Sequence, residues 1–264
     1  MSEKELVGKA AIVTGGAGAF GTATGFELAG RGAAVVVADL DGAAAERVAA
    51  DIRRKTGAST LAVGCDVREE SSVAKMVEST IAAFSRVDIL VNNAGIFPMG
   101  PLAETTVERW DEIMAVNVRG VFLCCKHAIP HMSERNAGCI VNISSAVGRV
   151  ALPNLVPYSA SKAAVIAMTV GLAKELGPRG IRVNAVCPST VSTPGWAEPR
   201  KVLSAAMGLP EDQVLDVLVQ GQVIKRMLTP EEIARVVAWL ASDATSMVTG
   251  QAIGIDGGIA FPTY

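Results

Sequence analysis

Sequence features typical of several other protein classes are rare or missing here. The five cysteines are scattered without a C-x-x-C pair, and the chain has only two histidines, so we expect reduced thiols and no metal site. This cysteine usage favours a cytoplasmic location. His127 and His131 are four residues apart, which a metal could exploit, but no third ligand accompanies them. We expect both to lie on a helix surface.

Long basic and long apolar segments are also lacking. The formal net charge is −2 and no cluster of lysine and arginine stands out, so nucleic acid is not an expected partner. No apolar run reaches the roughly 18 residues of a membrane span, and the first residues, MSEKELVGK, lack the apolar centre of a signal peptide. The sequence therefore predicts no membrane association and favours small-molecule chemistry.

Aromatic residues make up only 4% of the chain although half of it is hydrophobic, so aliphatic residues must build the core. Such a composition favours an α/β protein, in which buried parallel strands are continuous aliphatic runs. Short apolar runs alternate with helix-like segments along the chain. The strand-like runs cover residues 10–14, 33–38, 60–65, 87–91, 140–143, 181–186 and 250–255. The helix-like segments cover residues 22–31, 43–55, 71–84, 104–115, 117–135, 157–174 and 231–241. We predict one domain, residues 1–264, with a Rossmann fold: a doubly wound parallel sheet of about seven strands with helices on both faces.

A glycine-rich turn, GGAGAFG, joins the first predicted strand to the first predicted helix. A turn of this kind can aim backbone N–H groups at a pyrophosphate, although glycine alone can also serve a plain turn. Asp39 ends the second strand, 24 residues after Gly15, where its carboxylate can accept hydrogen bonds from both hydroxyls of an adenosine ribose. Gly16 and Leu40 supply no cation for a 2′-phosphate, so NAD is preferred to NADP. The alternative is that Asp39 only begins the turn at Asp41.

Three polar residues around the fifth strand and the next helix suggest acid/base chemistry. Tyr158 and Lys162 are four residues apart, so they share one face of a helix. Lys162 and a cationic cofactor ring would lower the pKa of Tyr158 from its usual value of about 10. Ser145, just after a strand, would hold an alcohol or carbonyl oxygen. The alternative is an ordinary helix with a core tyrosine and a solvated lysine. Asn117, inside an apolar helical pattern, suggests a hydrogen-bonding task, structural or catalytic.

Taken together, these motifs resemble the short-chain dehydrogenase/reductase family from Leu6 to about Ile259. The motifs appear in family order: T-G-x(5)-G from Thr14 to Gly21, Asp39, Asp66, NNAG at 92–95, Asn117, Ser145 thirteen residues before Tyr158, Lys162, and the C-terminal Gly250-Gln251 and Asp256-Gly257-Gly258. Ala19 and Ser189 stand where the family usually has glycine, so we expect local differences in the loops that hold the cofactor.

The resemblance implies a role for each of these residues. Tyr158 would be the general acid/base, Lys162 would lower its pKa and bind the nicotinamide ribose, Ser145 would orient the substrate oxygen, and Asn117 would support a proton relay through water. Asp66 would contact adenine. The residues implied to bind the NAD cofactor are Gly15, Gly18, Phe20, Gly21, Asp39, Leu40, Asp66, Val67, Asn93, Ala94, Gly95, Tyr158, Lys162, Pro188, Val191 and Thr193.

The remaining expectations concern substrate and assembly. Residues 194–228 form an apolar insertion that the resemblance marks as a substrate lid, with Trp196 near its start; Phe97, Met99 and Cys187 are further candidates for the pocket wall. The resemblance also implies a homotetramer. The leading interpretation is an NAD-dependent enzyme that interconverts a secondary alcohol and a ketone with an apolar body. A 3-oxoacyl-thioester reductase, a dihydrodiol dehydrogenase and a non-catalytic dinucleotide-binding regulator are the alternatives.

Overall fold

The computed structural model describes residues 4–193 and 197–259. At its centre is a parallel sheet of seven strands in the order β3-β2-β1-β4-β5-β6-β7. The chain thus winds outward in one direction from β1 and then in the other from β4, so the topology reverses between these two strands. The strands are β1 (Ala10–Thr14), β2 (Ala34–Asp39), β3 (Thr60–Gly64), β4 (Ile89–Asn92), β5 (Gly138–Ile143), β6 (Ile181–Pro188) and β7 (Ala252–Ile255).

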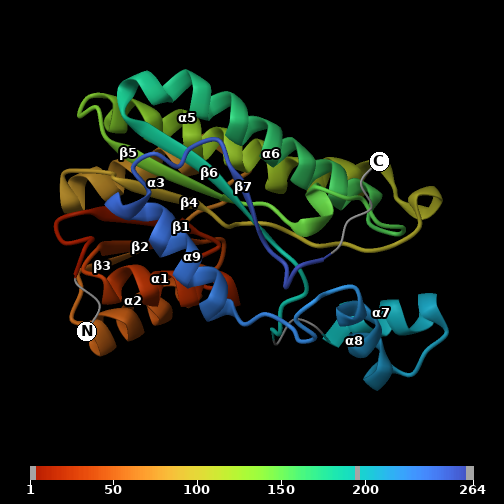
Figure 1. The fold of residues 1–264 in the computed structure, drawn as a ribbon. Coiled ribbons are helices and arrows are strands. Elements are labelled where there is room, and N and C mark those ends of the chain that lie inside the picture. The colour runs from red at the N-terminus through yellow and green to blue at the C-terminus, as the bar shows by residue number, and fades with distance from the viewer. Residues whose placement is uncertain (1–3, 194–196, 260–264) are drawn as a thin grey trace.

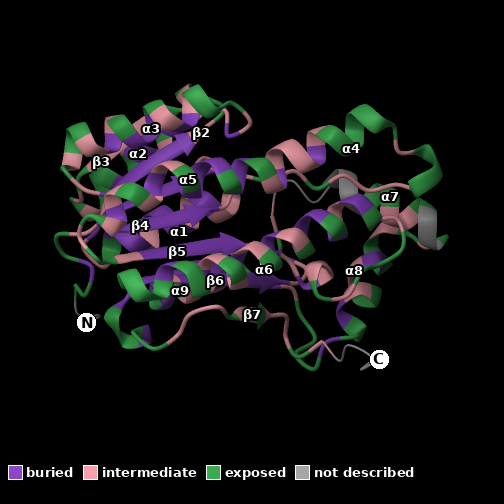
Figure 2. Cartoon of the chain, turned by 90° about the horizontal axis from the view of Figure 1, so that it is seen from above, coloured by how far each residue is buried: buried purple, intermediate pink, exposed green. Residues whose placement is uncertain are grey.

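The central strands are mostly apolar because side chains on both faces of the sheet are buried there. Successive residues point to opposite faces: Val35 and Val37 belong to one hydrophobic cluster, whereas Val36 belongs to the other. Figure 2 shows the central strands almost entirely buried beneath helices whose outer sides are exposed. This explains why most strands have aliphatic residues on both faces rather than an alternating pattern.

Three helices cover each face of the sheet (Figure 1). One cluster includes residues of α1 (Ala19–Gly30), α2 (Gly42–Thr56) and α9 (Pro230–Ala241). The other includes residues of α3 (Glu70–Phe84), α5 (Gly120–Ser133) and α6 (Val156–Leu176). The predicted fold class, a doubly wound parallel sheet with helices on both faces, is confirmed.

Several element boundaries differ from the sequence-based expectation. Helix α1 begins at Ala19 rather than at residue 22, because Gly18 adopts an extended N-cap conformation and the helix follows at once. The two helices predicted at 104–115 and 117–135 are one nearly continuous structure. It comprises α4 (Val107–Met114), a π-helical segment (Ala115–Arg119) and α5, so Asn117 lies in the widened π turn.

Two helical stretches, Val107–Ser133 and Val156–Arg179, are long and apolar enough to cross a membrane by length and composition. Many of their apolar residues are packed inside the protein, however. Val121, Leu123 and Cys124 of α5, and Val165 and Leu176 of α6, are buried in the hydrophobic cluster on one face of the sheet. These stretches are core helices of this fold.

Helices α7 (Ala197–Met207) and α8 (Glu211–Gln220) lie together beside the sheet rather than on either face (Figure 1). They connect the end of β6 to α9. Helix α9 begins with a capping box in which Thr229 and Glu232 satisfy each other's backbone N–H groups, and Pro230 occupies the first turn. The α7–α8 unit corresponds to most of the predicted lid region; Trp196 lies outside the described residues.

Candidate active site

The glycine-rich turn is shaped by close backbone approaches. Gly15 has a φ of 60°, and a Cβ on it would lie 2.9 Å from Ala94 Cα. Gly21, in the first turns of α1, packs even closer, because a Cβ there would lie 2.2 Å from the Gly15 carbonyl oxygen. Both positions therefore need glycine. Ala19 is the first residue of α1, so its methyl group is accommodated in ordinary helical backbone.

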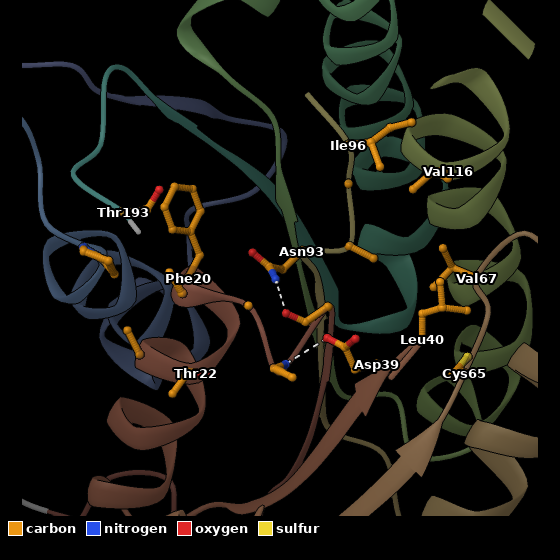
Figure 3. A pocket seen from close by; sticks show the side chains of 18 of the residues that line it. Phe20, Thr22, Asp39, Leu40, Cys65, Val67, Asn93, Ile96, Val116 and Thr193 are labelled. Carbon is orange, nitrogen blue, oxygen red and sulfur yellow. Dashed lines mark hydrogen bonds between the residues drawn. The ribbon is translucent and has the colours of Figure 1, made fainter. Parts of the chain in front are cut away.

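Asp39 at the end of β2 holds the turn from the side. Its Oδ2 accepts a hydrogen bond from Ala17 N at 2.9 Å, and its Oδ1 accepts one from Asp41 N at 3.1 Å. Figure 3 shows the carboxylate of Asp39 directed toward the glycine-rich turn, next to Leu40. The two alternatives for Asp39, a cofactor ligand or a turn residue, are thus compatible, because a carboxylate can accept further hydrogen bonds on the remaining lone pairs.

The NNAG segment braces the turn from the opposite side. Asn93 Nδ2 donates to the carbonyl oxygens of Thr14 and Gly15, both at 2.9 Å, and Thr14 Oγ1 accepts from the backbone N–H groups of Asn93 and Ala94 at 3.1 Å each. These bonds lock the carboxyl ends of β1 and β4 together. This is the edge where the strand order reverses, and open α/β sheets bind ligands in that crevice.

A cleft of about 1210 Å³ opens at this edge. Phe20 and Thr193 lie on one side of it, and Asp39, Leu40 and Val67 lie on the other (Figure 3). Most of the predicted cofactor residues line it: Gly15, Gly18, Phe20, Asp39, Leu40, Asp66, Val67, Asn93, Ala94, Gly95 and Thr193. The left-handed glycine turn, the uncapped N-terminus of α1 and the flanking carboxylate fit the pyrophosphate and ribose of a dinucleotide.

The predicted adenine residue Asp66 is already engaged within the protein. Arg68 donates to both of its oxygens, with Nη2 at 2.6 Å from Oδ2 and Nε at 2.9 Å from Oδ1. This forked ion pair lowers the pKa of the Asp66 carboxyl. Asp66 and Arg68 both line the cleft. Sequence reasoning did not single out Arg68, because a lone arginine two residues after an aspartate carries no signal of its own.

The four predicted catalytic residues gather at the carboxyl end of β5 and the start of α6. Lys162 Nζ lies 5.6 Å from the centre of the Tyr158 ring and donates to the Ile143 carbonyl oxygen at 2.9 Å. Gly95 connects this group to the cleft, because a Cβ on Gly95 would lie 3.2 Å from Asn117 Oδ1 and 3.4 Å from Lys162 Nζ. Lys162 and Asn117 therefore stand directly behind the cleft wall.

Burial dominates the protonation of this group. It raises the pKa of Tyr158 to about 12, partly opposed by a hydrogen bond with Ser145. It lowers the pKa of Lys162 to about 8. The expected depression of the Tyr158 pKa by Lys162 is therefore not a property of the protein alone, because desolvation is the largest influence on the phenol.

Two neighbouring serines have different partners. Ser144 is buried, and its Oγ donates to the Lys162 carbonyl oxygen at 2.8 Å, which anchors α6 on β5. Ser145 is half-buried; its Oγ accepts from Val147 N at 3.3 Å and shares a hydrogen bond with Tyr158. Ser145, the residue preferred from its spacing, is thus the serine that adjoins the phenol.

Asn117 has a fully committed amide group. Its Oδ1 accepts from Ile96 N at 2.9 Å, and its Nδ2 donates to the Ile96 carbonyl oxygen at 3.0 Å and to Ser161 Oγ at 3.1 Å. The side chain thus ties the segment after β4 to α6. The polar residue in an apolar helical pattern therefore has a structural hydrogen-bonding task.

The remaining predicted residues lie around the end of β6. Pro188 is the last residue of β6, Val191 is buried against Leu228, and Thr193 reaches the cleft. Cys187 is completely buried, so it does not form part of a pocket wall, contrary to expectation. All the free cysteines in the described part of the chain are buried. His127 lies near Glu70, with 3.2 Å between Nε2 and Oε1.

Phe97 covers the phenol. Its ring meets the Tyr158 ring edge to face, with 4.7 Å between centroids and an interplanar angle of 83°. Phe97 is also 40% exposed, so it presents apolar surface beside the catalytic group. Sequence reasoning missed several cleft residues on α1, α4 and α9, because these elements converge only in the folded chain; they include Ala23, Phe26, Glu112, Pro230 and Ala234.

Comparison with known proteins agrees with this geometry. The family model described as enoyl-(acyl carrier protein) reductase matches residues 15–260. The chain is 43% identical to the cis-4-hydroxycyclohexanecarboxylate dehydrogenase of Sinomonas cyclohexanicum, over 95% of this chain and 96% of that protein. It is 38% identical to the 3-oxoacyl-acyl-carrier-protein reductase of Thermotoga maritima, over 96% of this chain and 98% of that protein.

Among solved structures, NAD+-bound xylitol dehydrogenase superposes with a TM-score of 0.92 at 32% identity, over 96% of this chain and all of that one. The chain belongs to the short-chain dehydrogenase/reductase family, and it is an oxidoreductase that uses a nicotinamide dinucleotide. The predicted family and enzyme class are therefore confirmed.

Proposed function

We propose that this protein is an NAD-dependent dehydrogenase that interconverts a secondary alcohol and a ketone, with Tyr158 as the proton-transferring residue. The observation that carries this proposal is that Tyr158, Lys162 and Ser145 lie together at the sheet edge, with Lys162 Nζ directly behind the Gly95 wall of the dinucleotide cleft. A binding protein without turnover has no need of a phenol, an amine and a hydroxyl gathered there. The regulatory alternative is therefore disfavoured.

Each of these groups has a defined task. When bound, the nicotinamide ring would supply the hydride chemistry: it would accept a hydride from the alcohol carbon or donate one to the ketone carbon. In ketone reduction the neutral phenol of Tyr158 donates its proton to the carbonyl oxygen, which suits its raised pKa. In alcohol oxidation the phenolate takes the hydroxyl proton, and the charge of Lys162 stabilises that phenolate. Ser145 holds the substrate oxygen by hydrogen bonding.

The charges around the cleft support NAD over NADP. The lining residues described in the structure include five carboxylates and one guanidinium, that of Arg68; the carboxylates belong to Glu27, Asp39, Asp66, Glu112 and Glu231. Arg68 is bound to Asp66, so its charge is compensated. A 2′-phosphate would bring about −1.5 to −2 charges against Asp39 without a free cation to offset them.

The substrate that fits best has an apolar body. Phe97 exposes apolar surface beside Tyr158, and the relative named above acts on a hydroxylated cyclohexane ring. A 3-oxoacyl thioester is the second candidate, favoured by the similarity to the acyl-carrier-protein reductase. A dihydrodiol is the third. We further propose a single domain whose segment 194–228 acts as the lid over this site.

We also propose that the protein is a cytoplasmic homotetramer. The buried free cysteines suit a reducing compartment. Helices α4 and α5 expose Val107, Trp110 and Phe122, which supports contact between subunits on this surface. Light scattering of the purified protein should give a mass of about four chains in solution; a monomer at micromolar concentration would reject the assembly.

The test of function measures nicotinamide absorbance with NAD and NADP in parallel, against secondary alcohols, cyclohexanols, acyl thioesters and dihydrodiols. We expect reduction of NAD by an alicyclic or other apolar secondary alcohol. The Tyr158→Phe variant should retain NADH binding and lose turnover by at least about a thousandfold, because it lacks the transferable proton.

Two results would reject parts of this proposal. Preference for NADP would overturn the argument from Asp39 and the carboxylate-lined cleft. Unchanged turnover in Tyr158→Phe would remove Tyr158 from the mechanism, whichever dinucleotide is used.

A further inference from the structure

Ser189 stands where the short-chain dehydrogenase/reductase family usually has glycine. Its side chain makes a contact that glycine could not make. It is the first residue after β6, and its backbone N–H donates to the Ile255 carbonyl oxygen at 3.0 Å, which extends the β6–β7 ladder. Its hydroxyl donates to Gln222 Oε1 at 3.1 Å. The side chain thus links the end of β6 to a residue 33 positions later in the chain.

Gln222 is a buried amide whose bonding groups are all used. Only 2% of the residue is exposed, and its Nε2 donates to the carbonyl oxygens of Ile224 at 2.9 Å and Arg226 at 2.8 Å. Ser189 supplies the hydrogen bond to Oε1. A buried amide that loses a partner carries an uncompensated desolvation cost. Loss of the Ser189 hydroxyl therefore leaves the buried Gln222 Oε1 without this hydrogen-bond donor.

The segments on either side of this contact are also joined through their backbones. Leu228 N donates to the Thr190 carbonyl oxygen at 3.0 Å, and Ser192 N donates to the Leu228 carbonyl oxygen at 2.9 Å. The backbone N–H groups of Val223 and Ile224 both donate to the Gly257 carbonyl oxygen at 2.9 Å. Gln222 therefore sits where three segments meet: residues 189–193, residues 221–228 and the turn after β7.

Two of these segments continue into the cleft wall. Residues 189–193 end at Thr193, and residues 221–228 lead to Pro230; both of these residues line the cleft. Residues 221–228 also begin directly after α8, which belongs to the proposed lid. The contact between Ser189 and Gln222 consequently fixes one end of the cleft relative to the base of the lid.

We propose that Gln222 is a positioning residue that acts through the Ser189 hydroxyl to hold residues 189–193 at the nicotinamide end of the cleft. This inference rests on the proposed function and on the family resemblance, which implies that Val191 and Thr193 contact the carboxamide of the nicotinamide. In the described part of the chain, no hydrogen bond joins Ser189 or Gln222 to the glycine-rich turn or to Asp39, which hold the adenosine side. Removal of the hydrogen bond between Ser189 and Gln222 should therefore weaken binding of the whole dinucleotide and leave binding of its adenosine half unchanged.

The test compares NADH with ADP-ribose, which lacks the nicotinamide, by calorimetric titration of wild type, Ser189→Ala, Ser189→Thr and Gln222→Leu. We expect Ser189→Ala and Gln222→Leu to raise the dissociation constant of NADH by about tenfold, the effect of one lost hydrogen bond to a buried group. ADP-ribose affinity should stay within about twofold. Ser189→Thr retains a hydroxyl and should restore NADH binding.

Amide hydrogen exchange provides a second measurement that does not depend on ligand. In Ser189→Ala, exchange should accelerate at the amides of Ser192, Ile224 and Leu228 and stay unchanged at Val35 in β2. Equal weakening of NADH and ADP-ribose, or no change in either affinity or exchange, would overturn the positioning role while the dehydrogenase assignment stands. Failure of wild type to bind either ligand would instead reject the proposed function and this inference together.

Discussion

The ring of Phe97 stands edge to face on the ring of Tyr158, with 4.7 Å between their centroids. Phe97 follows the NNAG segment after β4, whereas Tyr158 lies in the first turn of α6, so the contact joins the cofactor side of the site to the proton-transferring residue. The ring of Tyr158 is therefore oriented from both sides, by Phe97 and by the hydrogen bond with Ser145.

Phe97→Ala should lower kcat while leaving NADH affinity unchanged. An aromatic pair contributes roughly 1 kcal/mol beyond the area it buries, and its loss lets the phenol leave its reactive orientation, so we expect a fall of roughly fivefold. Phe97→Tyr retains the ring contact and serves as the matched control. Equal kcat values for Phe97→Ala and wild type would show that Tyr158 is oriented without this contact.

Tyr158 can be titrated almost in isolation, because Tyr264 is the only other tyrosine in the chain. Burial raises the pKa of Tyr158 to about 12, so the native protein retains a proton that the unfolded chain releases near pH 10. In a Tyr264→Phe protein at pH 10.5, the native state should show little phenolate absorbance, whereas the urea-unfolded chain should be about three-quarters ionised.

The same shift has a consequence for stability. Since the native state binds more protons than the unfolded state between pH 10 and about 12, the free energy of unfolding should fall as pH rises through this range. The Tyr158→Phe variant should lack this part of the decline. A native Tyr158 that ionises near pH 10 would contradict a buried, desolvated phenol.

Asp39 has two roles that substitution should separate. Asp39→Ala removes the acceptor for Ala17 N and the negative charge that repels a 2′-phosphate. We expect the ratio of NADP to NAD efficiency to rise at least about tenfold, and thermal stability to fall because a turn hydrogen bond is lost. Asp39→Asn retains one acceptor oxygen, so it should shift the cofactor ratio with a smaller loss of melting temperature. An unchanged ratio in both variants would exclude Asp39 from cofactor selection.

The fold and the order of the site residues were predictable because they depend on local patterns. Buried parallel strands are continuous aliphatic runs, and the glycine-rich turn needs its glycines for reasons of backbone geometry, so AAIVT and GGAGAFG identify the first βα unit directly. Tyr158 and Lys162 are related by helical spacing alone. These features require no knowledge of distant contacts.

The features that were missed depend on contacts between distant segments. The π turn that contains Asn117 forms around hydrogen bonds to Ile96 and Ser161, which lie far away in the sequence. The pKa of Tyr158 depends on how deeply α6 is buried, which a four-residue spacing does not reveal. Gln222 has no local pattern at all, since its partners come from the end of β6 and from its own loop.

The Asp66–Arg68 pair leads to the last prediction. Arg68 lowers the pKa of the Asp66 carboxyl below its ordinary value of 3.8, so Asp66 keeps its charge, and any stability that depends on it is lost only as pH falls through that lowered value. In Arg68→Ala the carboxyl should protonate at higher pH and lose its fixed orientation. We expect ADP-ribose affinity to fall roughly tenfold at pH 7 and to decline further at a higher pH than in wild type.

The Arg68→Lys variant tests the geometry of this pair, because an ammonium supplies the charge without the two-pronged contact, and its affinity should lie between those of wild type and Arg68→Ala. Arg54→Ala breaks a comparable ion pair with Asp51 on the outer surface of α2, at 2.7 Å, and should leave ADP-ribose binding unchanged. Calorimetric titration of ADP-ribose between pH 7 and about pH 3.5, which spans the ordinary pKa of an aspartate, measures all four proteins. If the curves for Arg68→Ala and Arg54→Ala coincide, Asp66 does not depend on Arg68 for its part in the cleft.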